Sequence, residues 1–149
     1  MRFPRVDFAD ENACFRTLFK FIHPEGWGCP DCHEREGIRV HENHRLSWRI
    51  VYQCTHCRRY FNAWTNTDLE GTHYTPSEIL RLMQTHVQGK SNLQLAHELG
   101  RDPGKLAKCF QRRLQGLTFR LFGPPPKKNE GKQDAVKMRR NIQIFWWAP

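Results

Sequence analysis

The chain has 149 residues, of which 38% are hydrophobic and 26% charged, a composition that indicates a folded protein and excludes a disordered one. Its 24 Lys and Arg against 15 Asp and Glu give a formal net charge of +9, which points to a polyanionic partner such as nucleic acid. A basic balance that serves solubility alone is the alternative. The length suits two small modules, one of them held by a metal.

Nothing in the sequence predicts a targeting or membrane segment. No stretch approaches the roughly 18 consecutive apolar residues of a membrane span, so we expect no membrane partner. Met1 to Arg5 is not followed by the apolar run of a signal peptide. We therefore expect a cytoplasmic protein, associated with the nucleoid when bound to DNA, whose thiols stay reduced.

Residues 8–22 are predicted to form an amphipathic helix with Asp10 as its N-cap. Its apolar face carries Cys14, Leu18, Phe21 and Ile22, widened by Phe15 and Phe19. We expect this helix to pack against the segment that follows it and to bury Cys14 as a core residue.

Two cysteine pairs follow the helix, each with two residues between its members. They are Cys29-Pro30-Asp31-Cys32 and Cys54-Thr55-His56-Cys57, with 21 residues between the pairs. Each pair can close on a metal from one tight turn, and two turns supply all four ligands of one tetrahedral Zn²⁺. Four protein ligands leave no position for water or substrate, so the spacing predicts a structural zinc and no catalytic residue.

Two alternatives to this ligand set remain open. A pair of disulfides would need an oxidising compartment, which nothing in the sequence suggests. A neighbouring histidine would have to replace a sulfur, although four sulfurs are available; the candidates are His33, His41, His44 and His56.

Between and after the cysteine pairs, the residue pattern predicts three strands. Residues 38–40 and 48–53 flank a polar turn at 42–45 and indicate a hairpin, and residues 59–64 indicate a third strand. Together with the cysteine turns they form a three-stranded zinc ribbon. Four arginines on this ribbon are candidates for phosphate contacts, or else a solvated basic face: Arg45, Arg49, Arg58 and Arg59.

After a polar linker at residues 66–74, the hydrophobic period changes to that of helices. Thr75 and Glu78 form a capping box with Pro76 at the first helical position. A short second helix follows Ser91 and ends at Gly100, and it is predicted to bury Leu93, Leu95, Ala96 and Leu99. A third helix starts at Asp102-Pro103 and is predicted to end near Gly116.

The third helix has one apolar face and one basic face. The apolar face carries Leu106, Cys109, Phe110 and Leu114. The outer face offers hydrogen-bond donors to base edges or phosphates, namely Lys105, Lys108, Gln111 and Arg112, with Arg113 beside them. This order of helices is typical of a helix-turn-helix whose last helix enters the major groove. An ordinary three-helix bundle with a charged outer face is the alternative.

The C-terminal part, residues 117–149, is predicted to be a basic and aromatic tail. Residues 117–122 suggest a short strand, basic residues follow between 127 and 140, and residues 142–147 form an aromatic cluster. This cluster either docks on a partner protein or nucleoprotein complex, or folds back on the chain's own core.

These features together resemble the N-terminal zinc-ribbon and helix-turn-helix region of bacterial insertion-sequence (ISXO2-like) transposases. The resemblance covers residues 8 to 115 and rests on four segments: Trp27 to Cys32, Tyr52 to Phe61, Glu70 to Thr72, and Leu95 to Gly100. Such turns often carry glycine where this chain has His33, Arg58 and Asn66. The resemblance implies binding of transposon-end DNA.

The family's catalytic part is not expected in this chain. The resemblance implies a following RNase H-like domain whose acidic residues hold Mg²⁺ for strand cleavage and joining. Only 34 residues follow Gln115, and the acids there are Glu130 and Asp134, whereas two-metal phosphoryl chemistry needs several convergent carboxylates.

We therefore predict a small α+β protein with three parts. An N-terminal helix and zinc ribbon occupy residues 1–66, a three-helix helix-turn-helix domain 75–116, and the tail 117–149. The predicted function is zinc-dependent binding of double-stranded DNA without catalysis and without a small-molecule substrate. The alternatives are a DNA-binding subunit of a transposase whose catalytic part is on another chain, and an adaptor that docks on a larger nucleoprotein complex.

Overall fold

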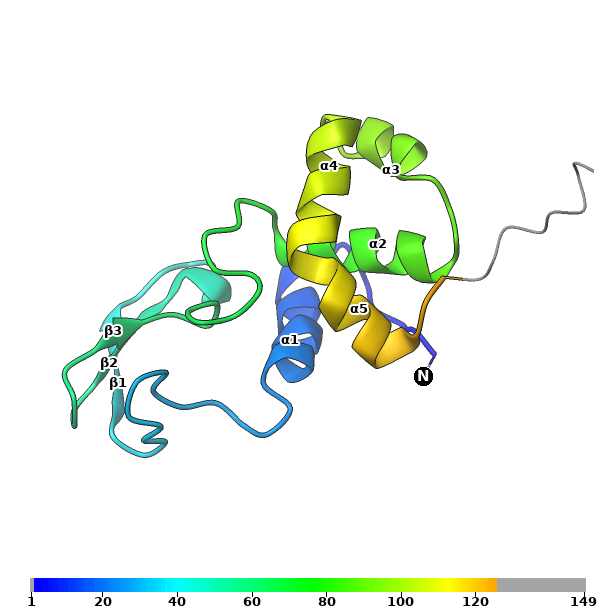
Figure 1. The fold of residues 1–149 in the computed structure, drawn as a ribbon. Helices are drawn as coiled ribbons and strands as arrows, with labels where there is room; N and C mark the ends of the chain where they lie inside the picture. Colours follow the sequence, from blue (N-terminus) through cyan, green and yellow to red (C-terminus); the bar gives the residue numbers. More distant parts are fainter. Residues whose placement is uncertain (1, 126–149) are drawn as a thin grey trace, which may run out of the picture.

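The computed structural model describes residues 2–125, which form a small sheet on one side and a group of helices on the other (Figure 1). The elements are α1 (Glu11–Ile22), β1 (Ile38–Glu42), β2 (Val51–Cys54), β3 (Tyr60–Phe61), α2 (Pro76–Val87), α3 (Asn92–Glu98), α4 (Pro103–Cys109) and α5 (Gln115–Phe122). The basic and aromatic part of the tail and its two acids lie outside the described residues. Between residues 2 and 125, no helix is both long and apolar enough to cross a membrane.

The three strands form an antiparallel sheet in the order β1-β2-β3, which confirms the predicted α+β class. Ile38 lies opposite Cys54, and Tyr52 lies opposite Phe61. The second strand starts at Val51 and not at residue 48, because a 3₁₀ turn over Ser47–Arg49 carries Trp48 into the core. The third strand is only two residues long, and the chain after Phe61 turns toward the helices.

Helix α1 begins at its predicted cap, where Asp10 Oδ1 accepts a hydrogen bond from the Ala13 backbone N–H at 3.0 Å. Cys14 and Leu18 are fully buried, as predicted for Cys14. They belong to the same core as the α2 residues Ile79, Leu80 and Leu82, so the expectation that α1 packs against the ribbon covers only part of its role. The helix has a second apolar face because Phe15 and Phe19 flank the first.

That second face joins α1 to the ribbon through aromatic contacts. The ring of Phe15 lies 6.3 Å from that of Trp48 and 5.5 Å from that of Trp64, measured between centroids. Phe19 lies 6.0 Å from Trp27. Helix α1 is therefore the element that connects the ribbon with the helices, and Figure 1 shows it beside α2.

The caps predicted for the next three helices are present. Thr75 and Glu78 form the capping box of α2, and the Ser91 and Asp102 side chains cap α3 and α4. Gly100 has the predicted left-handed conformation, with φ of 60°. Leu93 is an exception, because it is 65% exposed and not buried. It precedes the part of α3 that meets the core, where Leu95 and Ala96 are buried.

The prediction of a strand at residues 117–122 is wrong. Helix α4 continues through a π-helical stretch at Phe110–Leu114 into α5, which ends at Gly123 with φ of 81°. The apolar residues of this segment alternate, which suggests a strand, but Leu114, Leu117 and Leu121 also have helical spacing. Gly116 costs a helix about 1 kcal/mol relative to alanine, and burial of the Leu117 side chain offsets this.

Leu117→Ala tests whether α5 belongs to the helical core. Leu117 is 1% exposed, so we expect the substitution to lower the free energy of unfolding by about 2–5 kcal/mol. Urea denaturation followed by circular dichroism measures the change. Gln115→Ala, at an exposed position two residues earlier, is the control and should shift the midpoint little. Equal stability of the two variants would contradict the packing of α5.

Candidate metal centre and nucleic-acid interface

The two cysteine pairs lie on two tight turns with the same backbone hydrogen bonds. In the first turn, His33 N–H donates to the Cys29 carbonyl at 3.0 Å, and Cys29 N–H donates to the Glu34 carbonyl at 2.8 Å. In the second, Arg58 N–H donates to the Cys54 carbonyl at 3.0 Å, and Cys54 N–H donates to the Arg59 carbonyl at 2.9 Å. Each turn therefore presents its two thiols on one side.

Both turns close with a left-handed residue. His33 has φ of 61° and Arg58 has φ of 66°, and Asn66 has φ of 57° further along. These are the three positions where the family pattern has glycine. A side chain at positive φ carries a conformational cost, so the turns keep this backbone shape despite the residue type.

The four sulfur atoms of Cys29, Cys32, Cys54 and Cys57 lie within 4.8 Å of one another. The Cys29 and Cys57 sulfurs are 3.4 Å apart, and those of Cys32 and Cys54 are 3.6 Å apart. A tetrahedral zinc with Zn–S bonds of about 2.3 Å has sulfur–sulfur edges of about 3.8 Å. The geometry therefore fits a metal ion such as zinc, with all four positions occupied by sulfur.

The neighbouring histidines are not part of this group. His41 lies against Tyr60, with ring centroids 4.5 Å apart, and His44 Nδ1 accepts the Leu46 backbone N–H at 3.0 Å. The other two candidates, His33 and His56, are exposed residues of the turns themselves. The sulfur atoms alone converge.

The electrostatics of the thiols show why they need a cation. Burial raises the pKa of Cys29, but hydrogen bonds from the Cys32 and Asp31 backbones and from the Cys57 thiol prevail and lower this pKa to about 7. The backbone N–H of Glu34 favours the Cys32 thiolate, yet desolvation and the other thiols raise its pKa to about 12. Four adjacent thiolates repel one another, so a bound metal ion must displace protons from this group.

The ribbon has little core of its own. Only Cys29, Cys54 and Phe61 are buried in its apolar cluster, with Trp27, Ile38 and Tyr52 packed around them. Two of these three buried residues belong to the sulfur group that could hold a metal ion. Binding of a metal there would therefore be coupled to folding of the ribbon.

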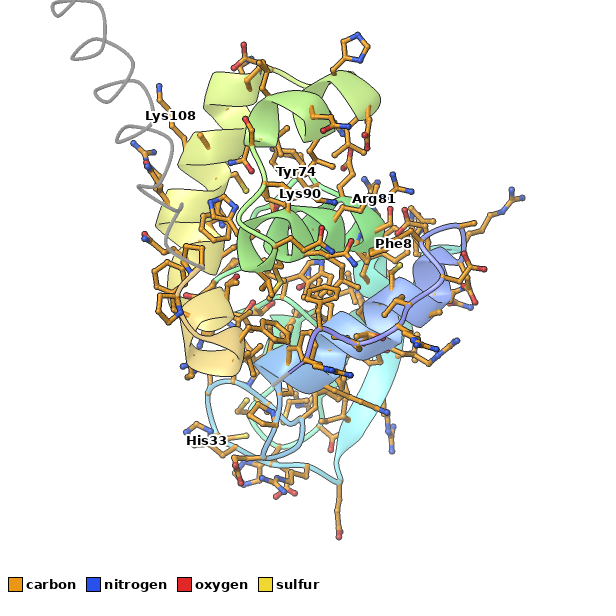
Figure 2. The ribbon with its side chains drawn as sticks, turned by 90° about the vertical axis from the view of Figure 1, so that its right-hand side faces the viewer. Phe8, His33, Tyr74, Arg81, Lys90 and Lys108 are labelled. Carbon is orange, nitrogen blue, oxygen red and sulfur yellow. The ribbon has the colours of Figure 1, made fainter. Side chains whose placement is uncertain are left out.

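The predicted DNA-contact residues fall into two groups. Lys105, Lys108, Gln111 and Arg112 are exposed on α4 and its π-helical continuation, while Leu106 and Phe110 are buried beneath them. Figure 2 shows Lys108 projecting from α4. Arg113 is half-buried, and its guanidinium donates to the carbonyls of Asp68 and Glu70. It therefore holds a loop and does not point outward with the others.

The ribbon arginines that are predicted to contact DNA lie in two separate regions of the structure. Arg58 and Arg59 adjoin the cysteine turns, and Arg59 Nε lies 3.6 Å from a carboxylate oxygen of Asp31. Figure 2 places His33, in the other cysteine turn, at the opposite end of the molecule from Lys108. Arg49 is exposed and lines a hollow of about 410 Å³ between the ribbon and the segment 71–74.

That segment is the feature that sequence reasoning missed. Residues 66–74 resemble a polar linker, but Leu69 is 1% exposed and anchors the loop in the core. A hollow of about 260 Å³ lies on the α4 side of residues 71–74 and is lined by Lys105, Lys108 and Arg112. In the sequence, Leu69 within a polar run is the one sign that this segment packs into the core. It gives no indication of the hollows on either side of the segment.

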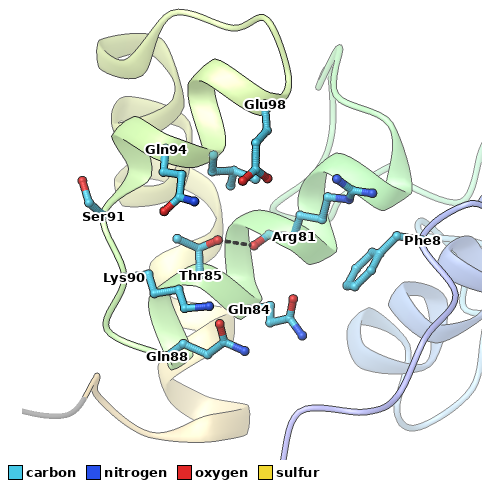
Figure 3. Close-up of a pocket in the computed structure, with 10 residues that line it drawn as sticks. Phe8, Arg81, Gln84, Thr85, Gln88, Lys90, Ser91, Gln94 and Glu98 are labelled. Carbon is cyan, nitrogen blue, oxygen red and sulfur yellow. Dashed lines mark hydrogen bonds between the residues drawn. The ribbon is translucent and has the colours of Figure 1, made fainter.

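Another hollow, of about 220 Å³, lies between the N-terminal segment, α2 and α3 (Figure 3). Its lining includes Arg81, which lies over the Phe8 ring at 5.1 Å, together with Lys90 and Glu98. It contains none of the predicted site residues, and its charges are mixed.

Cys29→Ser and Cys54→Ser test the metal centre. Each removes a buried sulfur ligand, so we expect loss of bound zinc and of the ribbon's order, with the helices retained. Zinc content by mass spectrometry and amide hydrogen exchange measure the two effects. Cys109→Ser is the control, since Cys109 lies on α4 and should leave zinc content unchanged. Full zinc content in the Cys29 and Cys54 variants would refute the assignment.

Comparison with known proteins agrees with this geometry. The family model of the transposase zinc-ribbon domain matches residues 9–60, which span α1, both cysteine turns and the sheet as far as Tyr60. No curated protein and no solved structure matches the chain. Over residues 9–60 this chain is therefore similar to the transposase zinc-ribbon domain of the IS1595 family, and the four cysteines of the candidate metal centre lie within the match.

Proposed function

We propose that this protein is a zinc-containing, transposase-derived DNA-binding protein that recognises double-stranded DNA and has no catalytic activity of its own. The observation that carries the proposal is the basic outer face of α4, supported on a packed core beside the four-cysteine ribbon. The net charge of +9 suits a polyanionic partner.

In this proposal α2, α3 and α4 act as a helix-turn-helix. Helix α3 is joined to α4 by a short turn through Gly100, and Leu95, Ala96 and Leu106 are buried where the helices meet. Arg101, in this turn, pairs with Glu78 of α2, with Nε 2.9 Å from Oε1. A rigid turn of this kind lets a recognition helix project from the protein surface.

Helix α4 is the proposed recognition helix because its outward residues are donors. Lys105, Lys108 and Arg112 suit phosphate oxygens, and arginine can also bind guanine through two hydrogen bonds. Gln111 suits adenine. Phosphate contacts supply most of the affinity in this class of complex, whereas contacts with base edges supply sequence preference.

The zinc has a structural role in this proposal. Four sulfur ligands leave no coordination position for water or substrate, so the ion holds the turns in place and performs no chemistry. Among the arginines of the ribbon, Arg49 adds a cation on the side of residues 71–74, whereas Arg58 and Arg59 adjoin the cysteine turns and Arg59 lies beside Asp31.

Lys108→Ala and Arg112→Ala test the proposed recognition helix. Each is expected to weaken duplex binding and to lower the slope of log K against log salt concentration by about one, because one phosphate contact is lost. Fluorescence anisotropy with a labelled duplex at several salt concentrations measures both quantities. Arg39→Ala, which removes one charge from β1, is the control. Unchanged binding by both α4 variants would exclude α4 as the DNA-binding element.

A separate experiment tests the proposed absence of catalytic activity. Purified protein incubated with Mg²⁺ and supercoiled plasmid should produce no nicked or joined product. Gel electrophoresis detects either product with high sensitivity. Metal-dependent nicking that co-purifies with the protein and disappears in the Cys29→Ser variant would overturn this part of the proposal.

A further inference from the structure

The segment Gly71 to Tyr74 separates two hollows, and both are lined by all four of its residues. The hollow on one side, about 260 Å³, faces α4. The hollow on the other side, about 410 Å³, faces the ribbon and is lined by His44, Arg49 and His73. The segment is therefore the floor of a surface that extends from the recognition helix to the ribbon.

The charge on this surface has one sign. Neither hollow has an Asp or Glu among the residues that line it, although the chain has 15 acidic residues. The cations are Lys105, Lys108, Arg112 and Arg113 on the α4 side and Arg49 on the ribbon side. The hollow in Figure 3 differs, because Glu98 lies in it beside Arg81 and Lys90.

The floor is held at both ends. The Arg113 guanidinium donates to the carbonyls of Asp68 and Glu70 before the segment, and Glu70 Oε2 accepts the Asn66 backbone N–H at 3.0 Å. At its other end, the guanidinium of Arg101 lies over the Tyr74 ring at 5.4 Å. These contacts place the ribbon-side hollow at a defined position relative to α4.

We propose that the ribbon-side hollow, through Arg49 and the flanking His44 and His73, binds phosphates of the same duplex that α4 binds. Duplex DNA carries about one negative charge per 1.7 Å of its axis, so its backbone is attracted to hollows whose lining has cations and no carboxylate. The inference rests on the proposed function, and it adds which part of the ribbon meets the duplex.

This assignment distinguishes Arg49 from the other arginines predicted to bind DNA. Arg59 is beside the cysteine turns and lies 3.6 Å from Asp31, and it lines neither hollow. Arg49 follows the turn that buries Trp48 and lines the hollow toward residues 71–74. Two arginines of the same ribbon are thus expected to differ in their contribution to binding.

The test compares Arg49→Ala with Arg59→Ala in the full-length, zinc-loaded protein. The probe is a duplex of about 30 base pairs, or three helical turns, chosen by selection from a random pool with the unaltered protein. Arg49→Ala should weaken binding by up to about tenfold at 0.1 M salt and lower the salt slope by about one. Arg59→Ala should change neither, and Arg49→Lys should retain most of the affinity.

A hydroxyl-radical footprint gives an independent readout. Arg49→Ala should lose protection at one flank of the site and retain it where α4 binds. Loss of the whole footprint, or equal effects of Arg49→Ala and Arg59→Ala, would overturn the proposal. So would binding by Arg49→Ala that equals that of the unaltered protein.

The outcomes separate this inference from the proposed function. If Lys108→Ala and Arg112→Ala weaken binding but Arg49→Ala does not, only the ribbon-side contact is wrong. If the unaltered protein does not bind duplex, or prefers a single strand of equal length, the proposed function fails and the inference fails with it. Zinc content and circular dichroism of each variant confirm that its fold is intact.

Discussion

The convergence of four cysteine sulfur atoms is the constraint on which the ribbon depends. The ribbon's separate apolar cluster, whose buried residues are Cys29, Cys54 and Phe61, is too small to order three short strands by burial alone. Metal–sulfur bonds can supply the missing free energy, on the order of 10 kcal/mol for a structural zinc at neutral pH. The left-handed conformations of His33 and Arg58 occur in turns that are closed by backbone hydrogen bonds to the Cys29 and Cys54 carbonyls.

Helix α1 connects the ribbon with the helical part of the structure. It has two apolar faces: Cys14 and Leu18 pack with α2, and Phe15 packs with Trp48 and Trp64 of the ribbon segment. Two hydrogen bonds reinforce the first face, because the Glu11 carboxylate accepts the Ser77 backbone N–H at 3.0 Å and the Ser77 hydroxyl at 2.5 Å at the start of α2. Helix α1 thereby holds the ribbon and the helices together, which the proposed binding of both to one duplex would require.

Much of the fold could be predicted because its signals are local. Helix caps depend on a few adjacent residues, and Asp10, Ser91 and Asp102 are found as predicted. The predictions that failed concern segments whose structure depends on packing against distant parts of the chain. Alternating apolar residues at 117–122 fit a strand or a helix, and the buried positions of Leu117 and Thr118 against the core select the helix. Leu93 shows the reverse, since an apolar residue at a helix start remains exposed when no neighbouring element covers it.

The sequence by itself determined the four-cysteine group, because the spacing within each cysteine pair and the chain reversal it requires are properties of a few consecutive residues. It also determined which helix carries exposed donors, since helical periodicity assigns Lys105, Lys108 and Arg112 to one side. Only the tertiary structure decided how these parts combine. Arg113 turns to the carbonyls of Asp68 and Glu70, and residues 71–74 separate two acid-free hollows. Contacts between residues more than 40 positions apart produce that arrangement, and no local pattern encodes them.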